Sequence, residues 1–231
     1  MDRTPEPELM DDEEQARAYS EADFAEPHER FVTLLNERLA GEELSGDVLD
    51  LGCGPADVTA RFARAFARCH VDGVDGAEAM LRFGRERLAR AGLEDRVTLT
   101  KAYLPDEPPP RASYDALISN SLLHHLDDPR VLWESVRRYA RPSAFVFVMD
   151  LMRPASREVA ERFVEEYAAG EPEVLRRDFF HSLLAAYTVD EVRGQIEAAG
   201  LSGLVVEAVS DRHLIAFGRV TLGGEPARGA P

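Results

Sequence analysis

The segment VLDLGCGPADV, residues 48–58, is the part of the sequence from which the fold is most clearly predicted. A short apolar run, Val48–Leu51, leads into Gly52 and Gly54, and a helical pattern begins after Pro55. Glycine lets the backbone bend sharply and approach a ligand closely because it has no Cβ, and a helix that starts beyond the turn presents backbone N–H groups. This order of strand, glycine turn and helix predicts a nucleotide site.

Asp75, at the end of the next predicted strand, supports that interpretation. It lies 21 positions beyond Gly54 in HVDGVDGAEAML, where a carboxylate can accept hydrogen bonds from ribose hydroxyls. The alternative is that Asp75 caps the helix that follows, and the two roles are compatible. Asp57 occupies the position of the third glycine of the dinucleotide fingerprint, so dehydrogenase chemistry is disfavoured. Asp50, just before the turn, favours a positively charged ligand.

The segments around this motif alternate between strand and helix patterns. Such alternation predicts a parallel, doubly wound sheet with right-handed crossovers. Thr188 begins a capping box with Glu191, which predicts the start of a helix. Only Ser210–Arg212 separate the last two predicted strands, and so short a connection requires an antiparallel pair. The expected strands are 48–51, 70–74, 97–101, 114–119, 144–149, 204–209 and 213–217.

We expect one folded domain with short extensions. Residues 1–13 are acidic and contain two prolines, which predicts a flexible lead-in. Apolar spacing over 14–40 predicts helices split near Pro27, and 151–187 shows two helical patterns without a strand between them. The domain spans 14–220, with 14–40 as an N-terminal lid and 151–187 as a helical insertion, and 221–231 form a flexible tail.

The charge of the chain limits its partners. The 231 residues carry 27 Lys and Arg against 43 Asp and Glu, a net charge of −16, and 45% are hydrophobic, as in a globular protein. Such an acidic chain is repelled by phosphate backbones and anionic lipid, so we expect neither nucleic acid nor a membrane as partner. Cys53 and Cys69 provide neither a disulfide framework nor a metal-ligand spacing, and no metal site is expected. Without a signal-peptide or membrane-span pattern, a cytoplasmic location is expected.

Three segments in order resemble the class I S-adenosylmethionine-dependent methyltransferases. DLGCG at 50–54 resembles the glycine motif of that family, GVDGAEAML at 73–81 its ribose-binding motif, and YDALISNSLLHHLDDP at 114–129 its motif around the fourth strand. The resemblance covers about residues 46–218. It implies a Rossmann-like, seven-stranded α/β sheet with an antiparallel last strand, and S-adenosylmethionine as cofactor.

The resemblance also implies site residues. His124 and His125, beside the methionine end of the cofactor, are candidates for a general base, although paired histidines in this segment are often packing residues. Tyr19 in the lid is a third catalytic candidate, or a half-buried ring that holds the first helix. The expected cofactor-binding residues are Asp50, Gly52, Cys53, Gly54, Asp75, Gly76, Met80, Ala102, Tyr103, Asn120 and Ser121.

The lid and the insertion supply the substrate-binding candidates. Each has a plain structural alternative, for example Arg153 as a surface cation and Asp178 as a helix N-cap. These candidates are Asp23, His28, Arg153, Asp178, Ser182 and Tyr187.

The chain departs from the family pattern at two places. The third small residue of the glycine motif is Ala56, where many members have glycine. Residues Lys101–Leu104, after the third strand, lack the acidic residue that in many members binds the adenine amino group. We therefore expect backbone groups of Ala102 and Tyr103 to bind adenine, with the Tyr103 ring as a stacking face.

The predicted function is methyl transfer from S-adenosylmethionine to a small polar metabolite by a monomer or homodimer. Two alternatives remain at this point: methylation of RNA or protein, which the acidic charge opposes, and a non-catalytic nucleotide-binding module on the same fold.

Overall fold

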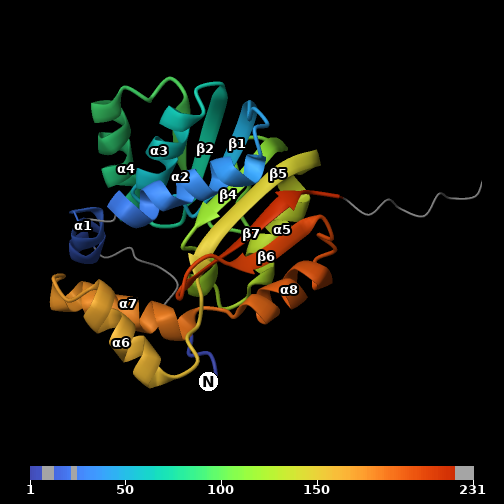
Figure 1. Cartoon of the computed structure of the whole chain (residues 1–231). Helices are drawn as coiled ribbons and strands as arrows, with labels where there is room; N and C mark the ends of the chain where they lie inside the picture. The colour runs from blue at the N-terminus through green and yellow to red at the C-terminus, as the bar shows by residue number, and fades with distance from the viewer. Residues whose placement is uncertain (7–12, 22–24, 222–231) are drawn as a thin grey trace, which may run out of the picture.

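A seven-stranded sheet forms the centre of the computed structural model, which describes residues 1–6, 13–21 and 25–221 (Figure 1). The strand order is β3-β2-β1-β4-β5-β7-β6, and β7 runs antiparallel to both of its neighbours while the other strands are parallel. The predicted doubly wound α/β fold with an antiparallel last strand is thus confirmed. The strands are β1 Gly46–Leu51, β2 Cys69–Asp75, β3 Val97–Lys101, β4 Tyr114–Asn120, β5 Ala140–Leu151, β6 Leu204–Ala208 and β7 His213–Arg219.

Helices cover both faces of the sheet, which explains why its central strands are apolar on both sides. On one face, α2, α3 and α4 bury a cluster in which the Phe31 and Phe147 rings meet edge to face at 5.0 Å. On the other face, α5 and α8 pack together, and Trp133 donates a hydrogen bond to Gln195 at 2.9 Å. The helices are α1 Glu13–Glu21, α2 Ala25–Leu39, α3 Asp57–Ala65, α4 Glu78–Ala91, the 3₁₀ turn η1 Leu123–His125, α5 Arg130–Tyr139, α6 Arg157–Tyr167, α7 Glu173–Ala185 and α8 Val189–Ala198.

The predicted insertion forms a pair of helices beyond the carboxyl end of β5 (Figure 1). There α6 and α7 pack against each other around Phe163 and Leu183. Helix α1 lies against the first turn of α4, where Ala16 contacts Ala77 and Met80. Both additions therefore lie near the end of the sheet where the parallel strands finish. None of the helices in the described residues is long and apolar enough to cross a membrane.

Apart from shifts of one or two residues at other strand ends, two predicted elements differ from the structure. Two helices do form in this region, Glu13–Glu21 and Ala25–Leu39, but Pro27 is the third residue of the second helix and does not separate the two. The first turn of a helix tolerates proline because its N–H groups have no partner within the helix. Strand β5 spans 140–151 where 144–149 was expected. Its start escapes an apolar pattern because Arg141 is half-buried and Pro142 and Ser143 are exposed.

The first six residues are packed on the domain, which the predicted flexible lead-in did not anticipate. Thr4 N donates to Leu184 O at 3.0 Å, and Arg3 Nε donates to Ala185 O at 2.5 Å. The Arg3 guanidinium also lies over the Tyr187 ring, 4.3 Å from its centre. These contacts bring the start of the chain to the end of α7. Residues 7–12 of the expected lead-in and 222–231 of the expected tail lie outside the described residues.

Candidate functional site

A cavity opens at the carboxyl ends of β1, β2 and β4. In the sheet, β2 lies on one side of β1 and β4 on the other, so the strand order reverses between β1 and β4. Ligands of open α/β sheets bind at such a reversal point. All of the residues expected to bind the cofactor line this cavity: Asp50, Gly52, Cys53, Gly54, Asp75, Gly76, Met80, Ala102, Tyr103, Asn120 and Ser121.

The glycine turn is a tight loop between β1 and α3. The backbone N–H groups of Gly52 and Cys53 both donate to Val74 O, at 2.9 and 3.0 Å. Gly52 has a φ of +70°, and an added Cβ would lie 2.8 Å from the Leu122 side chain, so only glycine fits there. Ala56 also adopts a left-handed conformation, with a φ of +56°. The alanine at this third position therefore keeps the backbone shape that the family pattern assigns to glycine, at some cost in strain.

Two carboxylates stand on either side of this turn. Asp75 accepts hydrogen bonds from Gly54 N and Ala77 N, each at 2.8 Å, which holds its side chain against the loop. It is not the N-cap of α4, because that position belongs to Ala77. Asp50 is buried and accepts a hydrogen bond from Thr59 Oγ1 at 2.6 Å. Burial, aided by Asp75, raises the pKa of Asp50 to about 7.

Asp57 joins three helices at one wall of the cavity. It binds His28 Nδ1 of α2 at 2.6 Å, Arg61 Nε of α3 at 2.9 Å and Arg87 Nη1 of α4 at 2.7 Å. Burial works against the ionised form, but these hydrogen bonds and charges outweigh it and hold the pKa of Asp57 below its usual range. His28, expected to bind substrate, does line the cavity, yet its Nδ1 is engaged by Asp57.

Tyr19 of α1 also lines the cavity. Burial, together with the carboxylates of Asp57, Asp150 and Asp75, raises its pKa to about 12. The phenol therefore keeps its proton at neutral pH and can donate a hydrogen bond, but it cannot serve as a ready base.

The segment after β3 forms another part of the lining. Ala102 N donates to Asp75 O at 3.0 Å, and Tyr103 N donates to Glu107 Oε2 at 2.8 Å. The two backbone N–H groups nearest the expected adenine position are therefore engaged within the protein. The Tyr103 side chain is 44% exposed, so its ring is accessible as a stacking face.

The two consecutive histidines of η1 have different surroundings. His125 lines the cavity, and burial, assisted by the neighbouring His124, lowers its pKa well below the ordinary value. His124 is buried and is not part of the cavity lining; its Nδ1 lies 2.5 Å from Asp150 Oδ1. Burial disfavours a charged His124, but Asp150 outweighs burial and raises its pKa. Only one of the two expected bases thus reaches the cavity.

Four of the remaining substrate-binding candidates lie in the described residues, and none of these four lines the cavity. Arg153 binds Glu191 at 2.6 Å and Ala186 O at 3.1 Å. Tyr187 donates to Leu126 O at 3.0 Å, and Ser182 donates to Glu6 at 3.0 Å. Asp178 lies on α7 beside Arg177, at 3.4 Å. Arg153, Ser182 and Tyr187 thus bind other groups of the protein near the end of α7. Asp23 lies outside the described residues.

Two residues near the cavity were missed by sequence reasoning. Asp150, the partner of His124, follows the apolar run of β5, and a single acid at the carboxyl end of a buried strand is a signal that could have identified it. Glu6 reaches both histidines of η1 from the N-terminal segment, and nothing in its local sequence indicates this. Apolar lining residues were also missed: Leu104, Leu122, Leu126, Val131 and Leu132.

Comparisons with known proteins point to methyltransferases. A family model described as a methyltransferase domain matches residues 49–146. The 27-O-demethylrifamycin SV methyltransferase of Amycolatopsis mediterranei is 30% identical over 188 residues, which cover 79% of this chain and 64% of that protein. This chain therefore spans less than two thirds of that relative. An uncharacterized methyltransferase of Mycobacterium bovis is 28% identical over 156 residues, covering 65% of this chain and 76% of its own length.

Solved structures share the fold. A SAM dependent methyltransferase from Aquifex aeolicus has a TM-score of 0.66 at 20% identity, covering 91% of this chain and 99% of that one. The plantazolicin methyltransferase BpumL, solved with a triazolic desmethylPZN analog and SAH, has a TM-score of 0.68 at 11% identity and covers 90% and 91%. With the ordered motifs and the sheet topology, these matches lead to one conclusion: the chain belongs to the class I S-adenosylmethionine-dependent methyltransferase family.

Proposed function

We propose that this chain transfers the methyl group of S-adenosylmethionine to a small polar metabolite. The observation that carries the proposal is the position of the predicted cofactor-binding residues, all of which line one cavity at the reversal point of the sheet. They come from separate parts of the chain, so their meeting is a property of the fold.

The cofactor's polar groups match the carboxylates of the cavity. In this proposal Asp75, held by Gly54 N and Ala77 N, accepts the ribose hydroxyls. Asp50 faces the ammonium and sulfonium end, where a nearby positive charge lowers the pKa of a buried carboxyl and favours its ionised form. Asn120 and Ser121 line the same end, and the Tyr103 ring stacks on adenine.

Methyl transfer is an in-line displacement that this site can promote by alignment. The bond from sulfur to the methyl carbon breaks while a bond from the acceptor atom to that carbon forms, and the electron pair stays on sulfur. Charge is dispersed, so the protein contributes orientation and exclusion of water. An acceptor that carries a proton must lose it; His125 lines the cavity and its lowered pKa keeps the imidazole neutral, as a base requires.

Two observations support a small acceptor. The net charge of −16 disfavours nucleic acid, and the described cavity lining contains Asp50, Asp57 and Asp75 but no Lys or Arg. One relative is named for a small molecule, 27-O-demethylrifamycin SV. A polar metabolite without phosphate fits this lining best.

Calorimetric titration with S-adenosylhomocysteine tests the cofactor site. We expect the parent chain to bind one equivalent, Asp75→Asn to bind roughly 10-fold or more weakly through loss of charge-assisted hydrogen bonds, and the exposed-site control Asp190→Asn to bind like the parent. Equal affinity in the parent and in Asp75→Asn would contradict the assignment.

Turnover is tested with cofactor labelled in the methyl group. Label transferred to small hydroxylated or amino metabolites is the expected result. Label that appears only in tRNA or protein, or cofactor that binds without conversion across all acceptor classes, would replace the proposal with one of the two alternatives above.

A further inference from the structure

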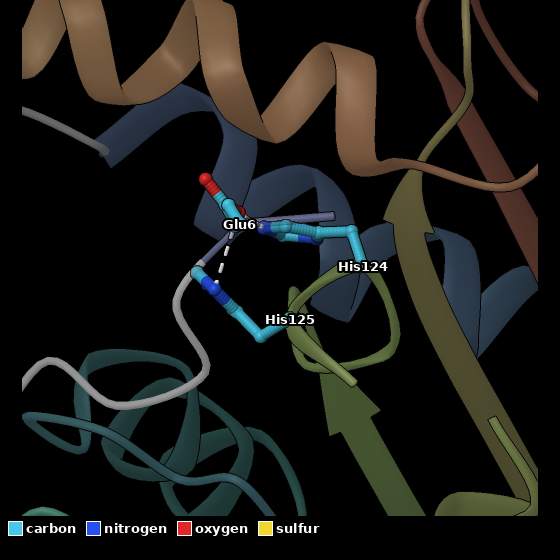
Figure 2. A group of neighbouring side chains, drawn as sticks. All are labelled: Glu6, His124 and His125. Carbon is cyan, nitrogen blue, oxygen red and sulfur yellow. Dashed lines mark ion pairs between the residues drawn. The ribbon is translucent and has the colours of Figure 1, made fainter. Parts of the chain in front are cut away.

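Glu6, His124 and His125 form a cluster of possible metal ligands beside the cavity (Figure 2). Figure 2 shows Glu6 entering from the N-terminal segment and facing both imidazoles of η1. Glu6 Oε1 lies 3.2 Å from His125 Nδ1 and 3.7 Å from His124 Nε2, and the three ligand atoms all lie within 4.8 Å of one another. We call these residues the Glu6 cluster.

The separations suit a small divalent ion. Zinc binds imidazole nitrogen and carboxylate oxygen at about 2.0–2.2 Å, so neighbouring ligands of a tetrahedral site lie roughly 3.3 Å apart. The distances from Glu6 Oε1 to the two histidine nitrogens, 3.2 and 3.7 Å, lie on either side of that value. The side chains are also shielded, with 10% of Glu6, 3% of His124 and 19% of His125 exposed.

Asp150 supports the cluster from behind. Its Oδ1 lies 2.5 Å from His124 Nδ1, and its Oδ2 accepts a hydrogen bond from Leu123 N at 2.8 Å. This contact fixes the His124 ring so that Nε2 points toward Glu6. A carboxylate on the far nitrogen is the usual outer partner of a metal-binding histidine. Together, Glu6 and Asp150 also balance the charge of a divalent ion.

A simpler explanation accounts for only part of the cluster. A protonated His124 between Asp150 and Glu6 would form an ion-pair chain without a metal. That explanation leaves His125 Nδ1, a buried nitrogen that lies 3.2 Å from Glu6 Oε1 but makes no hydrogen bond in the described structure. A metal ion would use the lone pair of this nitrogen.

We propose that Glu6, His124 and His125 bind a divalent transition-metal ion such as Zn²⁺, with Asp150 orienting His124. Two histidines and one glutamate are the ligand set of catalytic zinc sites, which keep a further position open. His125 lines the cavity, so that position faces the expected acceptor. The last step rests on the proposed function and gives His125 the role of a ligand in place of that of a base: an acceptor hydroxyl bound to the ion would have a lower pKa and would release its proton to solvent before methyl transfer.

Metal binding is tested on the full chain after treatment with a chelator. Titration with Co²⁺ is followed by visible absorption, which reports the coordination geometry of the ion, and competition with Zn²⁺ follows. We expect one equivalent in the parent, loss of the absorption bands in Glu6→Gln and His125→Gln, and about 10- to 100-fold weaker binding in Asp150→Asn. His70→Gln, which removes an exposed histidine on β2, is the matched control and binds like the parent.

The same variants are titrated with S-adenosylhomocysteine, and their unfolding temperatures are measured. Cobalt that binds equally well to the parent, Glu6→Gln and His125→Gln, or does not bind to the folded parent, would overturn the metal site. Unchanged S-adenosylhomocysteine binding would then leave the proposed function standing. If the parent chain binds cobalt but does not bind S-adenosylhomocysteine, the proposed function is contradicted and the metal site stands. Glu6→Gln is the decisive variant because it changes no residue of the sheet.

Discussion

Gly54→Ala separates the contribution of the glycine turn to cofactor binding from its contribution to folding, with Gly92→Ala as a matched control. Both glycines have left-handed backbone, with φ values of +50° and +64°, and an added Cβ meets no atom within 4 Å at either position. Gly54 lines the cavity, whereas Gly92 follows the last turn of α4 and does not. The two substitutions therefore impose similar strain, but only one places a methyl group in the cavity.

The magnitudes follow from this geometry. A left-handed conformation costs alanine roughly 1–2 kcal/mol relative to glycine, and the lower entropy of the unfolded chain returns about 0.4–1 kcal/mol. Each variant should therefore lose about 1 kcal/mol of unfolding free energy, which is about 2–4 °C for a chain of this size. A methyl group forced against bound cofactor costs about 1–3 kcal/mol, or roughly 5- to 150-fold in Kd.

The assay pairs thermal unfolding with calorimetric titration of S-adenosylhomocysteine. We expect similar unfolding temperatures for Gly54→Ala and Gly92→Ala, and weakened binding only for Gly54→Ala. Parent-like affinity in Gly54→Ala would show that the cofactor does not approach this turn. An equal loss of affinity in Gly92→Ala would show that general destabilisation, and not contact, controls binding. Either result would refute the reasoning.

Three further predictions concern charge and packing. Burial raises the pKa of Asp50 to about 7, so the folded state holds this proton more tightly than the unfolded chain, and stability falls as pH rises from about 4 to about 7. Asp50→Asn should therefore be more stable than the parent at pH 8, by on the order of 1–3 kcal/mol, with little gain at pH 4. Denaturant titrations at both pH values check this difference in stability. The variant should also bind cofactor more weakly. The pKa of Asp57 is instead lowered, so the stability that its ionised carboxylate contributes is present above about pH 4 and is lost as pH falls through the folded pKa. Asp57→Asn should therefore lose about 1–3 kcal/mol of unfolding free energy at pH 7, and urea titrations should show this deficit shrinking below pH 4. A deficit that does not change with pH would contradict the assignment. In Gly84→Ala the new Cβ would lie 2.7 Å from the Leu99 side chain, a clash that costs about 1–3 kcal/mol and exceeds the roughly 0.5–1 kcal/mol that alanine gains over glycine within a helix. In the control Gly194→Ala on α8 the new Cβ meets no atom within 4 Å, so that variant should keep the gain. A higher melting temperature in Gly84→Ala than in the parent would contradict the packing argument.

Much of the fold and of the expected cofactor site could be predicted because their signals are local. Gly52 and Gly54 follow an apolar run directly, and Asp75 ends the next one. Once the strands are parallel, their carboxyl ends must meet at one edge, so residues at those ends converge without knowledge of side-chain packing. The capping box of Thr188 and Glu191 is also local, and both of its hydrogen bonds form as predicted.

The lid and insertion were harder to interpret because their polar residues have many possible partners. His28 was expected to bind substrate, and its Nδ1 binds Asp57 from a helix that begins 29 positions later. Tyr187 and Ser182 bind Leu126 and Glu6 instead of lining the cavity. Residue type and spacing within one helix contain no information about which distant group a side chain will meet.

By itself, the sequence determined the order of strands and helices, the glycine turn and the positions of the strand-end carboxylates, because these depend on backbone preferences and apolar periodicity over a few residues. Only the tertiary structure decided which histidine reaches the cavity and which binds Asp150, and that Glu6 faces both. Those contacts join residues 26 and 118 positions apart, from Asp150 and from Glu6 to His124. Contacts of this length arise when helices, strands and the N-terminal segment pack together, and the packing of the whole chain sets them.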